Sequence, residues 1–202
     1  MIKFIKARWL MNIEIKIEPV EAITDYARIP ISFQIKSILR VIPADKGLGG
    51  IVLSEEKVEK PYYKDYDAHP GEGPESWPGR WDISGWEMLC AYSAGRRVGG
   101  ALVAYDTAGL NFLQGRKDMA ALWDIRVHPE FRGHGAGAEL FRRAMECAKK
   151  RGCRFLKIET QNNNVSACRF YARQGCELVA IDRRAYAGLP DETQLIWCKA
   201  IE

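Results

Sequence analysis

The stretch 122–150 constrains the fold most, because its pattern predicts a strand, a glycine-rich turn and a helix in direct succession. Residues 120–127 are apolar except for Asp124 and Arg126, which is typical of a largely buried strand. Pro129 ends that strand because proline fixes φ and donates no N–H. Beyond the turn, apolar residues recur every three or four positions, which predicts an amphipathic helix.

The glycine-rich turn, residues 132–137, has the chemistry of an anion-binding site. Amides in the first turn of a helix have no partner within the helix, and the macrodipole places partial positive charge there. Glycines allow close approach of a bulky anion, and Arg132 adds a cation. The spacing matches neither a P-loop nor the dinucleotide-binding fingerprint. From these residues alone, a pyrophosphate cradle and a plain tight turn both remain open.

The turn resembles the acyl-CoA-binding motif of the GNAT N-acetyltransferase superfamily, Gln/Arg-x-x-Gly-x-Gly/Ala. The fixed positions of that motif are filled by Arg132, Gly135 and Gly137. A second GNAT motif follows at the family's spacing, with Asn164, Ala167, Tyr171 and Gly175. Cys176 stands where the family usually has Phe, a departure that concerns packing. The resemblance covers about 86–202, and segments 63–67 and 159–164 look most like the streptothricin acetyltransferase group.

The resemblance implies a fold and a cosubstrate. The fold is α+β, with a mixed, mostly antiparallel central sheet of about six or seven strands flanked by helices. In that family the fourth and fifth strands splay apart, and the pantetheine arm of acetyl-CoA lies in the gap. The contacts with acetyl-CoA that the resemblance implies involve Ile125, Arg126, Val127, Arg132, Gly133, His134, Gly135, Ala136, Gly137, Asn164, Ala167 and Tyr171.

Acetyl transfer to an amine requires an oxyanion donor, loss of a proton from the amine and protonation of the thiolate. The Val127 N–H is the oxyanion donor that the resemblance implies. Tyr171 is the candidate acid, since a phenol of pKa about 10 can donate at neutral pH; the alternative is a core tyrosine. Asp124 is the candidate base or water relay, or else it binds a cation or supports the structure. Glu159 is the second candidate base.

Other segments carry simpler patterns. Strands are expected at 12–18, 51–53, 86–93, 98–107, 155–161, 177–182 and 194–199, and helices at 21–28 and 165–173. Residues 94–97 predict a hairpin turn between two of these strands. Residues 31–40 carry apolar side chains at a spacing that suits an amphipathic helix ending before Pro43.

Residues 55–85 predict an irregular, aromatic-rich loop. Its prolines and glycines prevent long regular structure, while its tyrosines and tryptophans argue against disorder. One interpretation is a surface loop held in place by its aromatic side chains. The other is a wall of the acceptor pocket, in which carboxylates attract a cationic amine; these are Asp65, Asp67, Glu72 and Glu75.

The 202 residues favour one domain, 1–202, with 47% apolar residues for a core. Segment 1–10 is interrupted by Lys6 and Arg8 and does not predict a signal peptide, and no apolar run suits a membrane span. A net charge of +4 does not indicate nucleic acid. The six cysteines and three histidines lack metal-site spacing, so no metal is expected. We expect reduced cysteines, a cytoplasmic location, and a monomer or homodimer.

The function expected is acetyl-CoA-dependent N-acetylation of a primary amine by direct attack in a ternary complex. The acceptor expected is a small amine, such as a streptothricin-like antibiotic. The alternatives are a protein N-terminal or lysine acetyltransferase and a non-catalytic acyl-CoA-binding module.

Overall fold

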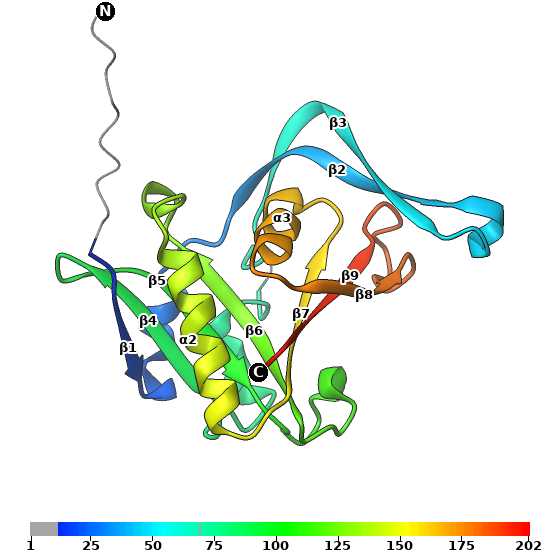
Figure 1. The fold of residues 1–202 in the computed structure, drawn as a ribbon. Coiled ribbons are helices and arrows are strands. Elements are labelled where there is room, and N and C mark those ends of the chain that lie inside the picture. The colour runs from blue at the N-terminus through cyan, green and yellow to red at the C-terminus, as the bar shows by residue number, and fades with distance from the viewer. Residues whose placement is uncertain (1–11, 69) are drawn as a thin grey trace, which may run out of the picture.

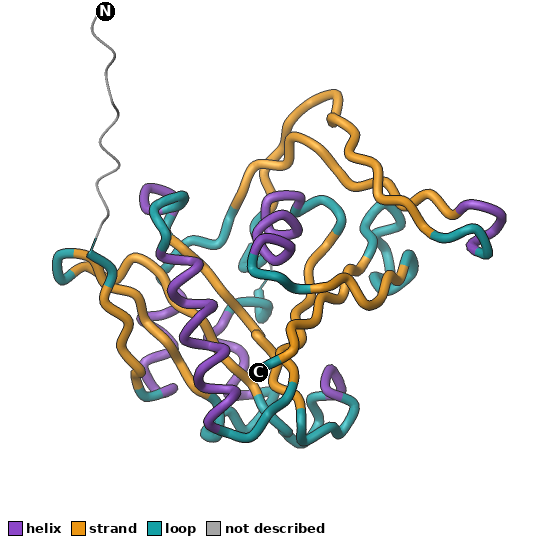
Figure 2. The backbone as a smooth tube through the Cα atoms, viewed as in Figure 1, coloured by secondary structure: helices purple, strands orange, loops and turns teal. Residues whose placement is uncertain are grey.

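The structure is a computed structural model that describes residues 12–68 and 70–202. The described residues form a seven-stranded sheet, a separate two-stranded ribbon, and helices on both faces of the sheet (Figure 1). The tube in Figure 2 shows how much of the chain is strand rather than helix. The prediction made for segment 1–10 lies outside the described residues.

The central sheet has the strand order β1-β4-β5-β6-β7-β9-β8. Its strands are β1 (Glu14–Glu18), β4 (Glu87–Ser93), β5 (Arg96–Ala104), β6 (Met119–Val127), β7 (Phe155–Gln161), β8 (Glu177–Asp182) and β9 (Gln194–Ala200). All neighbours pair antiparallel except β6 and β7, which are parallel. The predicted mixed, mostly antiparallel sheet is therefore confirmed.

The parallel pair β6–β7 opens into a gap, here called the split. The two strands pair only where residues 119–121 meet residues 155–157. Beyond Ala121 the strand β6 stays paired with β5 on its other side, while β7 stays paired with β9. The edges that face the split therefore carry backbone groups that are free of sheet pairing, as the family resemblance implies.

Helices α2 (Ala136–Lys150) and α3 (Val165–Arg173) cover one face of the sheet, and short α1 (Ile23–Ala27) lies on the other (Figure 1). Each face has its own buried cluster, centred on Leu140 and on Tyr26. Gly100 permits the second, because a Cβ there would lie 2.5 Å from the Tyr26 ring and 2.8 Å from the Leu89 carbonyl oxygen. Any larger residue would push α1 off the sheet.

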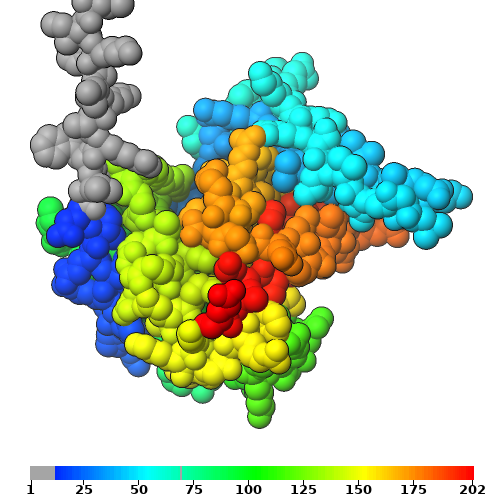
Figure 3. Space-filling model, in the orientation of Figure 1, coloured from blue at the N-terminus to red at the C-terminus, as the bar shows by residue number. Residues whose placement is uncertain are grey.

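The ribbon consists of β2 (Phe33–Pro43) and β3 (Ile51–Lys64), and it corrects two predictions. The segment 31–40 is mostly strand rather than amphipathic helix, because its backbone pairs with residues far along the chain that local periodicity cannot detect. The segment 55–64 belongs to β3, so the irregular region begins only at Asp65. Figure 3 shows that the far end of the ribbon protrudes from the body of the molecule.

The irregular segment 65–85 is held against the sheet by its aromatic side chains. Trp77 is buried, and Trp81 packs edge-on against Trp123 of β6 with 5.1 Å between ring centroids. Trp86 stacks on Trp81 at 6.3 Å. A short 3-10 turn at Pro74–Gly79 carries part of this cluster. The described residues of this segment therefore form an ordered layer over the face opposite α2, beside the split.

Candidate active site

The turn before α2 has the geometry of an open anion cradle. Gly133 and Gly135 adopt φ values of 80° and 95°, which L side chains rarely adopt, and a Cβ at either position would meet nothing within 4 Å. Gly135 is the N-cap of α2 and no side chain caps the helix. The first-turn amides of α2 therefore have no capping side chain and are available to an anion. Arg132 and His134 are exposed beside the two glycines, whereas Ala136 is buried.

The backbone of β6 offers a hydrogen-bond donor to the split. The His128 N–H bonds to the Val98 carbonyl at 2.8 Å, on the side of β5. Because successive N–H groups of a strand point to opposite edges, the Val127 N–H faces the split. Arg132 donates from Nε to the Val127 carbonyl oxygen at 2.8 Å, and Ile125 is half-buried nearby on β6.

Asn164 is the N-cap of α3, which covers the predicted helix 165–173, and its side chain has two contacts. Its Oδ1 accepts the Ala167 N–H at 3.1 Å, the usual N-cap bond. Its Nδ2 donates to the Tyr66 hydroxyl at 3.3 Å, and that hydroxyl donates to Gln161 of β7. Asn164 thus connects α3 to the irregular segment at the mouth of the split. The cap leaves Nδ2, rather than Oδ1, as the atom that could contact a ligand.

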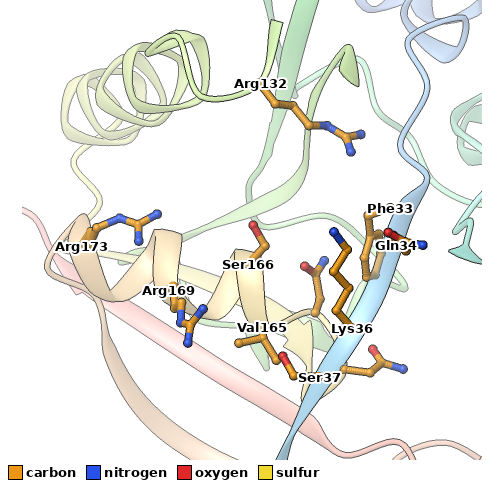
Figure 4. A pocket seen from close by; sticks show the side chains of 11 residues that line it. Phe33, Gln34, Lys36, Ser37, Arg132, Val165, Ser166, Arg169 and Arg173 are labelled. Carbon is orange, nitrogen blue, oxygen red and sulfur yellow. The ribbon is translucent and has the colours of Figure 1, made fainter. Parts of the chain in front are cut away.

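A hollow of about 490 Å³ lies between the glycine-rich turn, α3 and the ribbon (Figure 4). Its lining residues are Phe33, Gln34, Lys36, Ser37, Arg132, Asn163, Asn164, Val165, Ser166, Arg169 and Arg173. Four of them are cationic and none is acidic. The Asn163 Oδ1 atom is buried without a hydrogen-bond partner among the described residues. A polyanionic ligand with hydrogen-bond donors fits this lining.

Tyr171 is buried in the core beneath the split. Its ring packs against Phe170 and Phe141, with centroids 5.3 and 6.4 Å away, and against Trp197. Burial raises the pKa of Tyr171 above the usual range, and the negative charge of Asp124 raises it further. The phenol is therefore held in the protonated form that an acid needs.

Asp124 lies on β6 within a buried ionic cluster. Arg126 donates to both of its oxygens, from Nε at 2.9 Å and from Nη2 at 2.8 Å, and the Tyr26 hydroxyl donates to it as well. Arg126 also bonds to Asp67 at 2.7 Å and to the Ile29 carbonyl oxygen at 3.1 Å. Its side chain is only 1% exposed. These contacts occupy Asp124, which favours cation binding or support over direct proton abstraction.

Glu159 is on β7, across the split. It accepts the Tyr186 hydroxyl at 2.7 Å, and Tyr186 in turn accepts from Gln161 at 2.8 Å. Glu159 is half-buried and is free of ion pairs within the part of the chain described. Nearby, Lys64 pairs with Glu192 at the base of the ribbon. Of the two carboxylates considered from sequence, Glu159 is the one with fewer competing partners.

The family assignment follows from comparison with known proteins. The model of the acetyltransferase (GNAT) family matches residues 56–176, more than half of the chain. The chain belongs to the GNAT acetyltransferase family. This GNAT protein is an N-acetyltransferase, as its relatives and its split sheet agree.

The relatives of this GNAT acetyltransferase include streptothricin-modifying enzymes. It is 29% identical over 160 residues to streptothricin acetyltransferase A of Bacillus subtilis (strain 168), covering 78% of this chain and 84% of that one. It is 27% identical over 143 residues to streptothricin acetyltransferase of Streptomyces lavendulae, covering 71% of each. The crystal structure of nourseothricin acetyltransferase superposes with a TM-score of 0.72 at 25% identity, over 94% of this chain and 99% of that one.

A fold match is also found with a Bacillus anthracis str. Ames acetyltransferase, whose crystal structure is in complex with acetyl coenzyme A. The TM-score is 0.70 at 23% identity, over 96% of this chain and 99% of that one. Across the described part of this GNAT acetyltransferase, every helix is too short or too polar to cross a membrane.

Sequence reasoning missed three features of the site. Lys36 lies on a segment predicted as helix, so its place in the wall of the hollow was hidden. Tyr26 belongs to α1 and has no motif around it, although it donates to Asp124. The Arg126 side chain bonds to Asp124 and Asp67 in the ionic cluster, whereas the resemblance implied only a contact of Arg126 with acetyl-CoA. For the ionic cluster, the sequence offered one signal, which was the presence of Asp124 and Arg126 in an otherwise apolar strand.

Proposed function

We propose that this acetyltransferase uses acetyl-CoA to acetylate a primary amine of a small cationic acceptor, such as a streptothricin-like antibiotic. The observation that carries the proposal is the similarity to streptothricin acetyltransferase A of Bacillus subtilis, which extends over 84% of that enzyme. The fold supports it, because β6 diverges from β7 and leads directly into the glycine-rich turn before α2, as the family resemblance implies.

The residues present fit acetyl-CoA. The amides around Gly135 would hold the diphosphate, since the turn is open and lacks a capping side chain. The edge of β6 at residues 125–127 would bond the pantetheine amides along the split, and Asn164 Nδ2 lies at its mouth. When bound, acetyl-CoA supplies an activated acetyl group as a thioester.

The chain's own groups would then serve a direct transfer in a ternary complex. The acceptor nitrogen forms a bond to the acetyl carbon while the carbon–sulfur bond breaks. The Val127 N–H would stabilise negative charge on the carbonyl oxygen. Tyr171 would donate its proton to the departing sulfur, and its raised pKa means that the phenol carries that proton before the reaction.

The ammonium group of the substrate must lose a proton before it can attack, so a nearby side chain must accept that proton. Glu159 would take it, directly or through water, and Asp124 is the alternative through a water relay. The cluster of Arg126 with two carboxylates, Asp67 and Asp124, carries a surplus negative charge, and the Asp67 side chain is 25% exposed. That charge favours a cationic acceptor on the face opposite α2.

Thiol release tests the proposal. The purified protein, mixed with acetyl-CoA and streptothricin, should yield free coenzyme A and acetylated streptothricin. The product should be about 42 Da heavier than streptothricin for each transfer, because an acetyl group replaces a hydrogen. No thiol should be released when the protein or streptothricin is left out of the mixture. Expression should protect sensitive cells. Turnover with other amines but not with streptothricin would remove the antibiotic assignment and leave the acetyltransferase.

A further inference from the structure

The cationic hollow beside α3 contains more positive charge than a diphosphate turn requires. Arg132 belongs to the turn itself. Lys36 reaches in from β2, and Arg169 and Arg173 reach in from α3, so the cations come from three separate elements (Figure 4). Lys36 also lies outside residues 56–176, the part that matches the family model. The family motif therefore does not account for it.

The contacts of these cations divide them into two kinds. Arg169 pairs with Glu55 of β3, whose other oxygen accepts from the Ser37 hydroxyl at 2.6 Å. This link ties α3 to the ribbon. Lys36 and Arg173 have no ion pair among the described residues. Two cations at the rim of one hollow thus remain without a counter-charge, which is the arrangement expected of an anion site.

The backbone at Lys36 supports a role beyond surface charge. The register between β2 and β3 shifts there: Ile35 pairs with Tyr62, but Ser37 pairs with Lys57. The irregularity places Lys36 opposite extra residues of β3. Bulges of this kind re-aim a side chain and are common beside active sites. Bonds of 2.9 and 3.1 Å between Leu39 and Asn162 fasten the ribbon to the end of β7.

We propose that Lys36 and Arg173, assisted by Arg169, bind the 3′-phosphate of coenzyme A, so that the protein discriminates coenzyme A from 3′-dephospho-coenzyme A. This inference rests on the proposed use of acetyl-CoA. A ribose 3′-phosphate is a dianion that lies apart from the diphosphate in the same molecule. The uncapped amides before α2 serve the diphosphate, while the rim cations of α3 and the ribbon serve the third phosphate. The ribbon is thereby a wall of the cofactor cleft.

Calorimetry on the ligand-free full chain tests the proposal without relying on turnover. Wild-type protein should bind coenzyme A about tenfold more tightly than 3′-dephospho-coenzyme A. Each exposed ion pair contributes little by itself, but several cations here would act on one phosphate dianion. In the double variant Lys36→Ala with Arg173→Ala, coenzyme A should bind as weakly as the dephospho form. Binding of the dephospho form should be unchanged.

Lys60→Ala is the matched control, because Lys60 is an exposed lysine of the same ribbon that does not line the hollow. It should leave both dissociation constants unchanged, and melting curves should show that all variants fold. Equal binding of the two ligands by wild-type protein would overturn the proposal, as would equal weakening of both in the double variant. Failure of both ligands to bind wild-type protein would instead overturn the proposed cosubstrate.

Discussion

At the scale of single residues, Tyr171 has the clearest expected effect on the reaction. Tyr171→Phe should lower kcat about a hundredfold, near the low end for general acid–base catalysis, because a thiolate is a weakly basic leaving group. The dissociation constant for acetyl-CoA should stay nearly unchanged. Tyr105→Phe is the matched control: Tyr105 is also buried with a raised pKa, but it packs near Arg151 at the far end of α2.

The pH profile adds a second measurement of the same residue. Burial and Asp124 raise the pKa of Tyr171, so its phenol should remain protonated up to at least pH about 10. Below that pH, the wild-type rate should therefore show no decrease caused by deprotonation of Tyr171. The pH profiles of wild-type protein and Tyr171→Phe should have the same shape in this range. Such a fall would mean that Tyr171 titrates in its ordinary range or acts as a phenolate.

The cysteines are inert for a related physical reason. Burial raises the pKa of the Cys168 thiol to about 12, and Cys90, Cys147 and Cys176 have pKa values raised to about 12 in the same way. All six cysteines are free. Because the thiolate is the nucleophile, these thiols are packing residues rather than catalysts.

At the scale of elements, the two ends of α2 offer a controlled comparison. Gly135 before the helix and Gly152 after it both have positive φ and open space around a Cβ. Gly135→Ala and Gly152→Ala should each lower the free energy of unfolding by about 1–2 kcal/mol, the cost of a left-handed L residue. Urea titration measures this cost.

Only Gly135→Ala should also weaken coenzyme A binding, by about tenfold or ~1.4 kcal/mol in calorimetry, because its Cβ would occupy open space that the diphosphate would use. If Gly152→Ala weakened binding equally, the effect would be general destabilisation of α2. If neither variant did, the diphosphate would not lie at this helix end.

At the scale of the whole molecule, Arg126 joins three segments distant in sequence. Its guanidinium bonds to the chain after α1, to Asp67 of the irregular segment and to Asp124 of β6. Arg126→Met should lower the free energy of unfolding by about 3–5 kcal/mol, because it leaves the charge of Asp124, whose side chain is 8% exposed, without its cationic partner. Denaturant unfolding measures the loss.

Arg40→Met is the comparison, since Arg40 pairs with Glu56 on the exposed ribbon. It should change stability far less, because water screens an exposed pair. A similar decrease in the free energy of unfolding in both variants would show that burial does not strengthen the ion pairs of Arg126. The same result would contradict a role of Arg126 in holding the irregular segment against β6.

The sequence by itself determined the features that depend on local spacing. The strand, turn and helix around Gly135, the cap at Asn164 and the ends of helix 165–173 follow from neighbouring residues alone. The motifs therefore indicated the family, and the patterns of alternating strands indicated a mostly antiparallel sheet. Local steric and hydrogen-bond preferences act over a few residues, which is the range that sequence patterns report.

Only the tertiary structure decided what pairs with what across long separations. Segment 31–40 has helical spacing, yet it becomes β2 because residues 51–64 supply its hydrogen bonds. The same pairing brings Lys36 to the wall of the hollow beside α3. Likewise Asp124 appeared free in the sequence, but folding surrounds it with Arg126 and Tyr26. Such partners are set by the packing of whole elements, a non-local interaction that no short pattern encodes.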